Sequence, residues 1–456
     1  MIATLILAAA RRGGVACRSF ATASQRFEQQ ENALYSTGDL PGRNVDLFGP
    51  LAVRLVKGKG RGYVATGPIE LGDLLLCARP AAALHGPVED APDAALLMPQ
   101  LMALRPEALE WPQRAALAHL SDGTEASVSQ PPPPFWDPPS AGGAAASGAA
   151  AAASAAWPPP DEALARLIKV NAFGDDYEDL AAAAARGAGG RSCVGLWPAF
   201  AYFNHSCLPS TVHYVVGERM VVRAVQDIAE GEEVTISFLG RQEFAPVGAR
   251  QAVLRERWGF ECTCERCAVE AAAPPEVGRA VDAAYARVMT ELRPAFLEAA
   301  EAGDPSALAA AARGLRDADA SVRAALKAHA ERAHPATATF AAAALYELHE
   351  LAYAATQLGT GFGGDDGGER GQEALAALSR CLAIVDAVSR GAELHCFLAA
   401  RLLELASAAR GRDSAAAAAA LQLVGQAGEA RYGKQLGEKL WGALQAANAE
   451  LAGEYL

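Results

Sequence analysis

The chain is 456 residues long and 51% hydrophobic, and its 53 acidic residues exceed its 40 basic ones to give a formal net charge of −13. The length predicts two to four domains, because a domain commonly takes about 100–200 residues. The acidic balance argues against binding nucleic acid by general attraction to phosphate. No apolar run approaches the roughly 18 residues that a membrane-spanning helix needs. Nine cysteines, an odd number, do not fit a secreted disulfide scaffold and favour a reducing compartment.

The first 27 residues have the composition of an organelle transit peptide. No acidic residue precedes Glu28, whereas the same stretch contains the run RSFATAS and four arginines, which are Arg11, Arg12, Arg18 and Arg26. An apolar start followed by arginines is typical of a cationic amphipathic helix, while a secretory signal would begin with basic residues. We therefore expect import into a mitochondrion or plastid. The alternative is an unstructured N-terminus on a cytoplasmic or nuclear protein.

Two blocks with strand patterns follow, separated by an insertion. In residues 45–86, the runs VRLVKGKGRGYVAT and LGDLLLCA predict strands separated by turn residues. Residues 87–160 contain a proline-rich stretch and a segment of almost only Ala, Gly and Ser, which predicts a flexible linker. In residues 161–245, the runs TVHYVV, MVVRAV and EVTISF predict further short strands.

Residues 275–456 are predicted to be helical. Leu308, Leu315, Val322 and Leu326 recur at spacings of seven, seven and four, which is an amphipathic stripe. A proline, a glycine-rich loop and a further glycine divide the region into helices of roughly 15–25 residues. Successive helices of this size predict an antiparallel array, although no clean repeated signature is present.

The run CTCERC is the strongest chemical motif. Cys262, Cys264 and Cys267 have C-x-C-x-x-C spacing, which is unusual for three unrelated buried cysteines. Zinc prefers four tetrahedral ligands, and closed structural sites are commonly all cysteine. The fourth ligand must therefore come from elsewhere. We expect it to be Cys207 in the polar turn NHSC, with His205 as its competitor.

Four segments, the third made of two motifs, resemble the motifs of SET-domain protein-lysine methyltransferases and occur in the same order along the chain. KGKGRGYVAT is similar to the opening glycine-rich turn and VNAFG to the segment after the insertion. CVGLWPAFAYFNHSCLPS and GEEVTISF resemble the two motifs that cross in a pseudoknot, and WGFECTCERC resembles the cysteine-rich post-SET tail. A split domain followed by helices is similar to the SET-and-MYND branch. The insertion lacks the cysteines of a MYND zinc finger, and with them the expected docking of proline-rich partners.

The resemblance implies an α+β fold with a β-rich SET domain in two parts, residues 45–86 and 161–245. A post-SET zinc region would follow at 246–268, and an all-helical, tetratricopeptide-like domain at 275–456. The resemblance further implies that one structural zinc ion folds the tail over the active site. Its ligands would be Cys207, Cys262, Cys264 and Cys267.

The resemblance also implies a site for S-adenosylmethionine. Lys59 and Arg61, with the backbone around Gly60 and Gly62, would hold its amino-acid end, because cationic donors suit a carboxylate and glycine permits close backbone approach. The other residues implied to bind this cofactor are Asn171, Asn204, His205, Trp258 and Phe260.

The implied reaction is in-line transfer of the cofactor's methyl group to a deprotonated lysine of a protein substrate. The family usually has tyrosine where this chain has Phe238, and phenylalanine cannot hydrogen-bond. Loss of one well-aimed catalytic hydrogen bond can cost on the order of 10²–10³ in rate. Tyr202 or Tyr214 is the expected substitute. The alternative function is a SET-like scaffold with little turnover, whose helical domain recruits protein partners.

Overall fold

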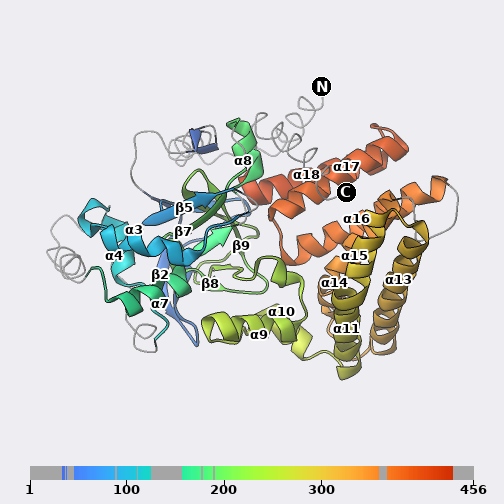
Figure 1. Cartoon of the computed structure of the whole chain (residues 1–456), viewed down its shortest axis with the longest axis horizontal. Helices are drawn as coiled ribbons and strands as arrows, with labels where there is room; N and C mark the ends of the chain where they lie inside the picture. The colour runs from blue at the N-terminus through green and yellow to red at the C-terminus, as the bar shows by residue number, and fades with distance from the viewer. Residues whose placement is uncertain are drawn as a thin grey trace.

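The computed structural model has a β-rich half and a helical half lying side by side (Figure 1). It describes residues 33–35, 37–38, 46–87, 90–109, 111–124, 157–175, 178–187, 190–358 and 367–434. The predicted transit segment, residues 1–27, and the Ala/Gly/Ser-rich linker lie outside these ranges. The arrangement confirms the predicted α+β class, with strands first and helices after them.

The central sheet of the β-rich half is antiparallel and buried on both faces. Its strand order is β1-β4-β10-β9. Leu75 and Leu76 pack into the core of the β-rich half, whereas Leu74 and Cys77 pack into a second core shared with the C-terminal helices. A strand covered on both faces is apolar throughout, which explains the run LLLCA. The strands are β1 (Leu47–Phe48), β4 (Leu74–Ala78), β9 (Thr211–Val216) and β10 (Arg219–Ala224).

Three smaller sheets surround this one. β2 pairs with β3, β7 lies between β5 and β6, and β8 pairs in parallel with β11. In the last pair Thr235 lies opposite Asn204 and Ile236 opposite His205, so the segments NHSC and TISF lie next to each other. The strands are β2 (Leu51–Val56), β3 (Gly60–Ala65), β5 (Ala82–Gly86), β6 (Phe173–Asp175), β7 (Ser192–Leu196), β8 (Asn204–His205) and β11 (Thr235–Ile236).

The described part of the insertion contains helices. Leu97, Leu101 and Leu120 are buried in the core of the β-rich half, and the indole of Trp157 donates a hydrogen bond to the main-chain oxygen of Leu101 at 3.0 Å. The insertion therefore starts and ends against the β-rich half. The helices here are α3 (Met98–Ala103) and α4 (Trp111–Ala118), followed after the linker by α7 (Asp161–Asn171) and α8 (Leu180–Ala185).

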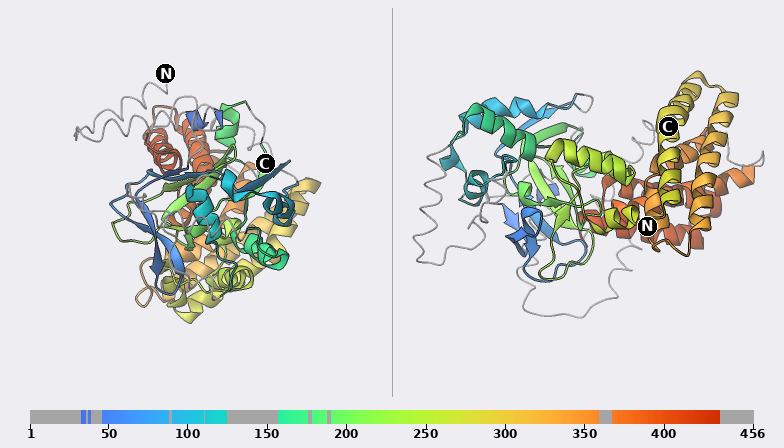
Figure 2. Two further views of the ribbon diagram at one scale, coloured as in Figure 1. Left: turned by 90° about the vertical axis from the view of Figure 1, so that its left-hand side faces the viewer. Right: turned by 90° about the horizontal axis from the view of Figure 1, so that it is seen from below.

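The helical half is a series of helices that pack on their neighbours in the sequence (Figures 1 and 2). The predicted stripe forms its core, because Leu308, Leu315 and Val322 are buried and Leu326 packs against them. Between the two halves lie α9 (Val247–Trp258) and α10 (Glu265–Ala271). The remaining helices are α11 (Pro275–Arg287), α12 (Arg293–Ala302), α13 (Pro305–Ala328), α14 (Thr337–Ala343), α15 (Tyr346–Gln357), α16 (Gly367–Val388), α17 (Glu393–Arg410) and α18 (Ala415–Tyr432).

Buried polar groups join the last helix to the central sheet. The hydroxyl of Tyr214 in β9 donates to the main-chain oxygen of Arg431 at 2.6 Å, and the Tyr35 hydroxyl lies 2.5 Å from it. The guanidinium of Arg431 pairs with Asp179 at 2.6 Å and lies 4.3 Å from the ring centre of Tyr214. Removing one partner of such a buried ion pair typically costs about 3–5 kcal/mol. The helical half is thus firmly attached to the sheet.

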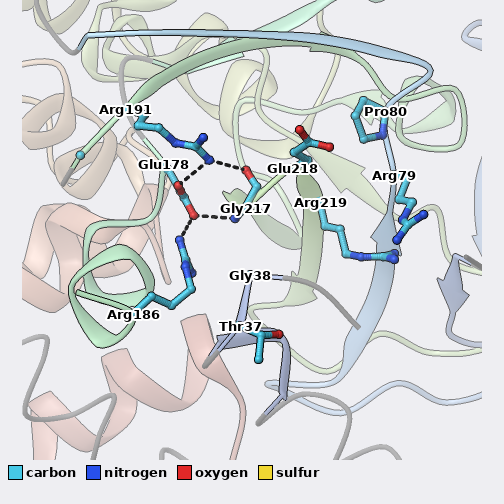
Figure 3. A pocket seen from close by; sticks show the side chains of 11 residues that line it. Thr37, Gly38, Arg79, Pro80, Glu178, Arg186, Arg191, Gly217, Glu218 and Arg219 are labelled. Carbon is cyan, nitrogen blue, oxygen red and sulfur yellow. Dashed lines mark hydrogen bonds and ion pairs between the residues drawn. The ribbon is translucent and has the colours of Figure 1, made fainter. Parts of the chain in front are cut away.

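At the edge of this sheet, Glu178 links the α8 region to the turn between β9 and β10 (Figure 3). Its carboxylate pairs with Arg186 and, at 3.3 Å, with Arg191, and it accepts the main-chain N–H of Gly217. These contacts hold two segments together that are distant in the sequence. Among the described residues, no helix combines the length and the apolar character needed to cross a membrane.

Candidate functional site

A cavity of about 430 Å³ opens where the β2–β3 hairpin, the loop after α4 in the insertion, the end of α7, the β8 segment and the turn after α9 meet. Most of the residues predicted to bind the cofactor or to act in catalysis line it. They are Lys59, Arg61, Asn171, Tyr202, Asn204, Phe238, Trp258 and Phe260. Gly60 lies in the same hairpin, at the start of β3. His205 lies behind Phe238, with 5.3 Å between their ring centres.

Glu233 joins the two polar residues at one side of this cavity. Its carboxylate pairs with Lys59 Nζ at 2.5 Å and accepts a hydrogen bond from Asn204 Nδ2 at 2.9 Å. Gly62 makes room for this arrangement, because a Cβ atom there would lie 2.3 Å from Asn204 Nδ2. Sequence reasoning missed Glu233, which is 174 residues from Lys59 in the chain.

Arg61 and Tyr202 form a second polar side of the cavity. Arg61 is 8% exposed, and its guanidinium carbon lies 5.6 Å from the ring centre of Tyr202. The Tyr202 hydroxyl donates to the main-chain oxygen of Ala116 in α4 at 3.0 Å, and burial raises the pKa of this phenol. Tyr214, the other expected substitute for the missing tyrosine, belongs instead to the junction with α18.

Asn171 attaches the loop after α4, which belongs to the insertion, to the cavity. Its Nδ2 donates to the main-chain oxygens of Ser121 at 2.6 Å and Leu167 at 2.8 Å. Both amide protons are used in this way, so the amide oxygen is the group that it can offer to a ligand. Nearby, Asp122 pairs with Arg166 at 3.4 Å. The insertion therefore contributes a wall of the site.

An aromatic wall closes the cavity on the side of the C-terminal tail. The ring centre of Phe238 lies 5.2 Å from that of Trp258 and 6.5 Å, edge to face, from that of Phe260. Trp258 ends α9, and Gly259 follows it with φ 75°, a left-handed conformation that lets the chain reverse. The reversal places Phe260 beside the same cavity.

The four cysteines predicted to bind metal come together beside this wall. Their sulfur atoms all lie within 4.8 Å of one another, and tetrahedral zinc with Zn–S bonds of about 2.3 Å would set them about 3.8 Å apart. Cys207 follows β8, while the other three come from the turn after α9 and the start of α10. The cluster could hold one metal ion that joins the tail to the β8 segment.

His205 connects the cluster to the cavity. Its Nδ1 accepts the main-chain N–H of Phe238 at 3.1 Å, so its Nε2 carries the hydrogen and faces Cys207 Sγ at 3.2 Å. The imidazole is 3% exposed. It thus contacts the cluster with one ring nitrogen and the backbone of the aromatic wall with the other.

Comparison with known proteins agrees with this geometry. A family model described as "SET domain" matches residues 60–239. A potential protein lysine methyltransferase, SET6 of Saccharomyces cerevisiae, is 38% identical over 82 residues, 18% of this chain and 22% of that protein. The histone-lysine N-methyltransferase SMYD3 of Homo sapiens is 40% identical over 74 residues, 16% of this chain and 17% of that protein.

A third relative, the protein-lysine N-methyltransferase SMYD4 of Homo sapiens, is 32% identical over 81 residues, 18% of this chain and 10% of that protein. The chain therefore aligns with less than a quarter of the length of each of these relatives. The match to the domain covers most of the segments that line the cavity, while Trp258 and Phe260 lie beyond its end. Residues 60–239 therefore match the SET-domain family model, and part of the chain is similar to proteins of the SET-and-MYND-like type.

Proposed function

We propose that the chain is an S-adenosylmethionine-dependent protein-lysine N-methyltransferase. The observation that carries the proposal is the convergence of Lys59, Arg61, Asn171, Asn204 and the aromatic wall on one cavity inside a SET domain. Its volume falls within the range of about 300–1,000 Å³ that is usual for small-molecule sites. Similarity to relatives named as lysine N-methyltransferases, SMYD3 and SMYD4, supports the same class of reaction.

The lining of the cavity fits this cofactor group by group. Arg61 and Lys59 offer cationic donors for a carboxylate, and the amide oxygen of Asn171 offers an acceptor for an ammonium group. Trp258 and Phe260 offer aromatic faces for a purine. S-adenosylmethionine would supply an activated methyl group. The chain itself would orient the two reactants and exclude water from them.

We propose zinc as the metal of the cysteine cluster, with Cys207, Cys262, Cys264 and Cys267 as its four ligands. The spacing of the sulfur atoms and the all-cysteine donor set fit a closed structural zinc site. Such an ion would keep Trp258 and Phe260 against the cavity, because both directly precede Cys262, Cys264 and Cys267 in one short segment.

Phe238 favours a second candidate, a scaffold that binds cofactor or peptide with little turnover. Its side chain offers no hydrogen bond, and the hydroxyl of Tyr202 already donates to Ala116. In the enzyme, the apolar wall at Phe238 would instead help an entering lysine to lose its proton, because desolvation disfavours the charged ammonium.

Methyl transfer from labelled S-adenosylmethionine to a library of lysine peptides tests the proposal on the zinc-loaded chain. Transfer by the wild type supports the enzyme. Cofactor binding without transfer, with transfer gained in Phe238→Tyr, would favour the scaffold. Lys59→Met should weaken cofactor binding, while Lys57→Met, an exposed lysine of the same hairpin, should not. Absence of cofactor binding would contradict the enzyme and any scaffold that binds the cofactor.

We also propose that residues 1–27 direct the protein to a mitochondrion or plastid. Their arginine content without acidic residues supports this. A fluorescent protein fused behind these residues should enter the organelle, and replacing their four arginines by glutamine should leave it in the cytoplasm. Import of the glutamine variant would contradict the proposal.

A further inference from the structure

Two arginines are completely buried beside the cysteine cluster. Arg250 in α9 and Arg266 in α10 are both 0% exposed. Arg250 Nη2 donates to Cys267 Sγ at 3.7 Å, and Arg266 Nη1 donates to the main-chain oxygen of Cys207 at 3.3 Å. The two guanidinium groups therefore contact the cluster through different cysteines.

Glu270 is the carboxylate that both arginines share. It pairs with Arg250 at 2.7 Å and with Arg266 at 2.9 Å. These two cations pair with a single carboxylate, and the nearby Glu243 carboxyl, whose pKa burial raises to about 7, offsets the remaining positive charge only where it is ionised. Buried charges are costly unless they are countered. Four thiolates around a zinc ion carry more negative than positive formal charge, so the loaded cluster would supply the missing counter-charge.

Arg266 also reaches the helical half of the molecule. Its guanidinium carbon lies 5.8 Å from the ring centre of Phe340 in α14, within the range of a cation–π contact. Its Nη1 also donates to the main-chain oxygen of Glu243 at 2.8 Å. The Glu243 carboxylate in turn accepts a hydrogen bond from Ser389, at the end of α16, at 2.5 Å.

Phe244, the residue after Glu243, also contacts the helical half. The ring of Phe244 stacks on that of Tyr346 in α15, with 4.4 Å between their centres. Phe244 and Phe340 belong to one hydrophobic cluster, together with Val269 of α10 and buried residues of α16. The cysteine cluster, Arg266 and this hydrophobic cluster thus form a continuous path from the SET domain to the helices.

We propose that Arg250 and Arg266 are the counter-ions of the zinc–cysteine centre, and that zinc binding stabilises the junction between the SET domain and helices α14–α16 through Arg266. This rests on the zinc site of the proposed function and not on methyl transfer. Without the metal, nothing fixes the four sulfur atoms beside the two guanidinium groups. The segments that they hold together should then separate more easily.

Zinc affinity of two variants, measured by competition with a chelator of known affinity, tests the first half of the proposal. Arg250→Met and Arg266→Met should bind zinc about 10- to 100-fold more weakly, the usual effect of losing a partner of a metal ligand. Arg255→Met is the matched control, because Arg255 lies on α9 and pairs with Glu261 at 2.6 Å but is exposed. Its zinc affinity should equal that of the wild type.

Thermal unfolding with and without zinc separates this role from a merely structural one. Zinc should raise the unfolding midpoint of both variants less than that of the wild type or of Arg255→Met. Zinc affinities unchanged from the wild type, or equal midpoint shifts in all four proteins, would overturn the assignment of the counter-ions.

Hydrogen exchange of the wild-type chain, loaded and then stripped of zinc, tests the second half without any variant. Stripping should speed exchange in α14 and at the end of α16 as well as in residues 259–271. Faster exchange in 259–271 alone would contradict the junction. A wild type that binds no zinc in the competition experiment would refute the metal site itself, which separates that failure from failure of the inference.

Discussion

The cysteine cluster and the cavity lie next to each other but are built in different ways. Three of the four cysteines come from one short run, whereas the walls of the cavity come from segments scattered between Lys59 and Phe260. A centre of identical ligands depends mainly on local spacing, while a pocket of unlike groups depends on the fold of the whole domain. The two meet at His205, which contacts Cys207 with one nitrogen and the backbone of Phe238 with the other.

Loss of one cysteine ligand should have the largest effect, because it should weaken both zinc binding and cofactor binding. Structural zinc contributes roughly 10–16 kcal/mol of binding free energy in small zinc domains, so Cys264→Ser should lose tight zinc binding. Cofactor binding should fall with it, because Trp258 and Phe260 belong to the same tail. Metal content after gel filtration and calorimetry with S-adenosylmethionine measure both. Cys396→Ala, a buried cysteine of α17, should keep zinc. A zinc-saturated Cys264→Ser would contradict the ligand set.

Removing one cation should damage the cavity and spare the cluster. A hydrogen bond to a charged group contributes about 1.5–3 kcal/mol, so Arg61→Met should weaken cofactor binding roughly 10- to 150-fold with zinc content unchanged. Arg54→Met is the matched control, since Arg54 lies on the paired strand β2, opposite Gly62, and is exposed. Equal cofactor affinities of these two variants would show that Arg61 does not contribute to cofactor binding.

A single methyl group should perturb the cavity by steric means alone. In Gly62→Ala the new Cβ would lie 2.3 Å from Asn204 Nδ2, and overpacking of this kind typically costs about 1–3 kcal/mol. We expect weaker cofactor binding, measured by calorimetry. Gly67→Ala serves as the control, because a Cβ there meets nothing within 4 Å. If Gly62→Ala binds the cofactor as tightly as the wild type, the position of Asn204 is not important for cofactor binding.

The smallest expected effect is a pH dependence at the junction. Burial raises the pKa of Glu243 from 4.5 to about 7. The folded protein therefore holds a proton that the unfolded chain releases above pH 4.5. The stability that this carboxyl contributes is complete below that pH and is lost as pH rises toward 7. Denaturant midpoints of the wild type and Glu243→Gln should be measured at pH 5.5 and 7.5. Between these two pH values the wild type should lose stability relative to the variant. A stability difference independent of pH would contradict this.

Much of the fold was predictable because its patterns are local. The apolar run LLLCA, the strands in TVHYVV and MVVRAV, and the stripe through Leu308, Leu315 and Val322 all lie where their periodicity suggests. EVTISF kept only the two residues of β11 as a strand, because the chain there pairs with β8 and then turns into the aromatic wall. The helices of the insertion were not foreseen, since its composition is dominated by the linker.

The contacts within the cavity were less predictable, because they join residues that are far apart in the chain. Nothing near Lys59 in the sequence indicates its pairing with Glu233, or that Tyr202 donates its hydroxyl to Ala116. The counter-ions of the cluster, Arg250 and Arg266, look like ordinary helix arginines until their burial is known. Sequence motifs identify the residues of a site, but tertiary contacts determine which of their atoms remain available to bind a ligand.

Calorimetric titration of S-adenosylmethionine into the zinc-loaded chain is the most direct test of the proposed cofactor site. We expect one molecule to bind to each chain, with affinity lost in Arg61→Met and kept in Arg54→Met. Absence of binding in a sample shown to contain zinc, or binding that Arg61→Met leaves intact, would contradict it.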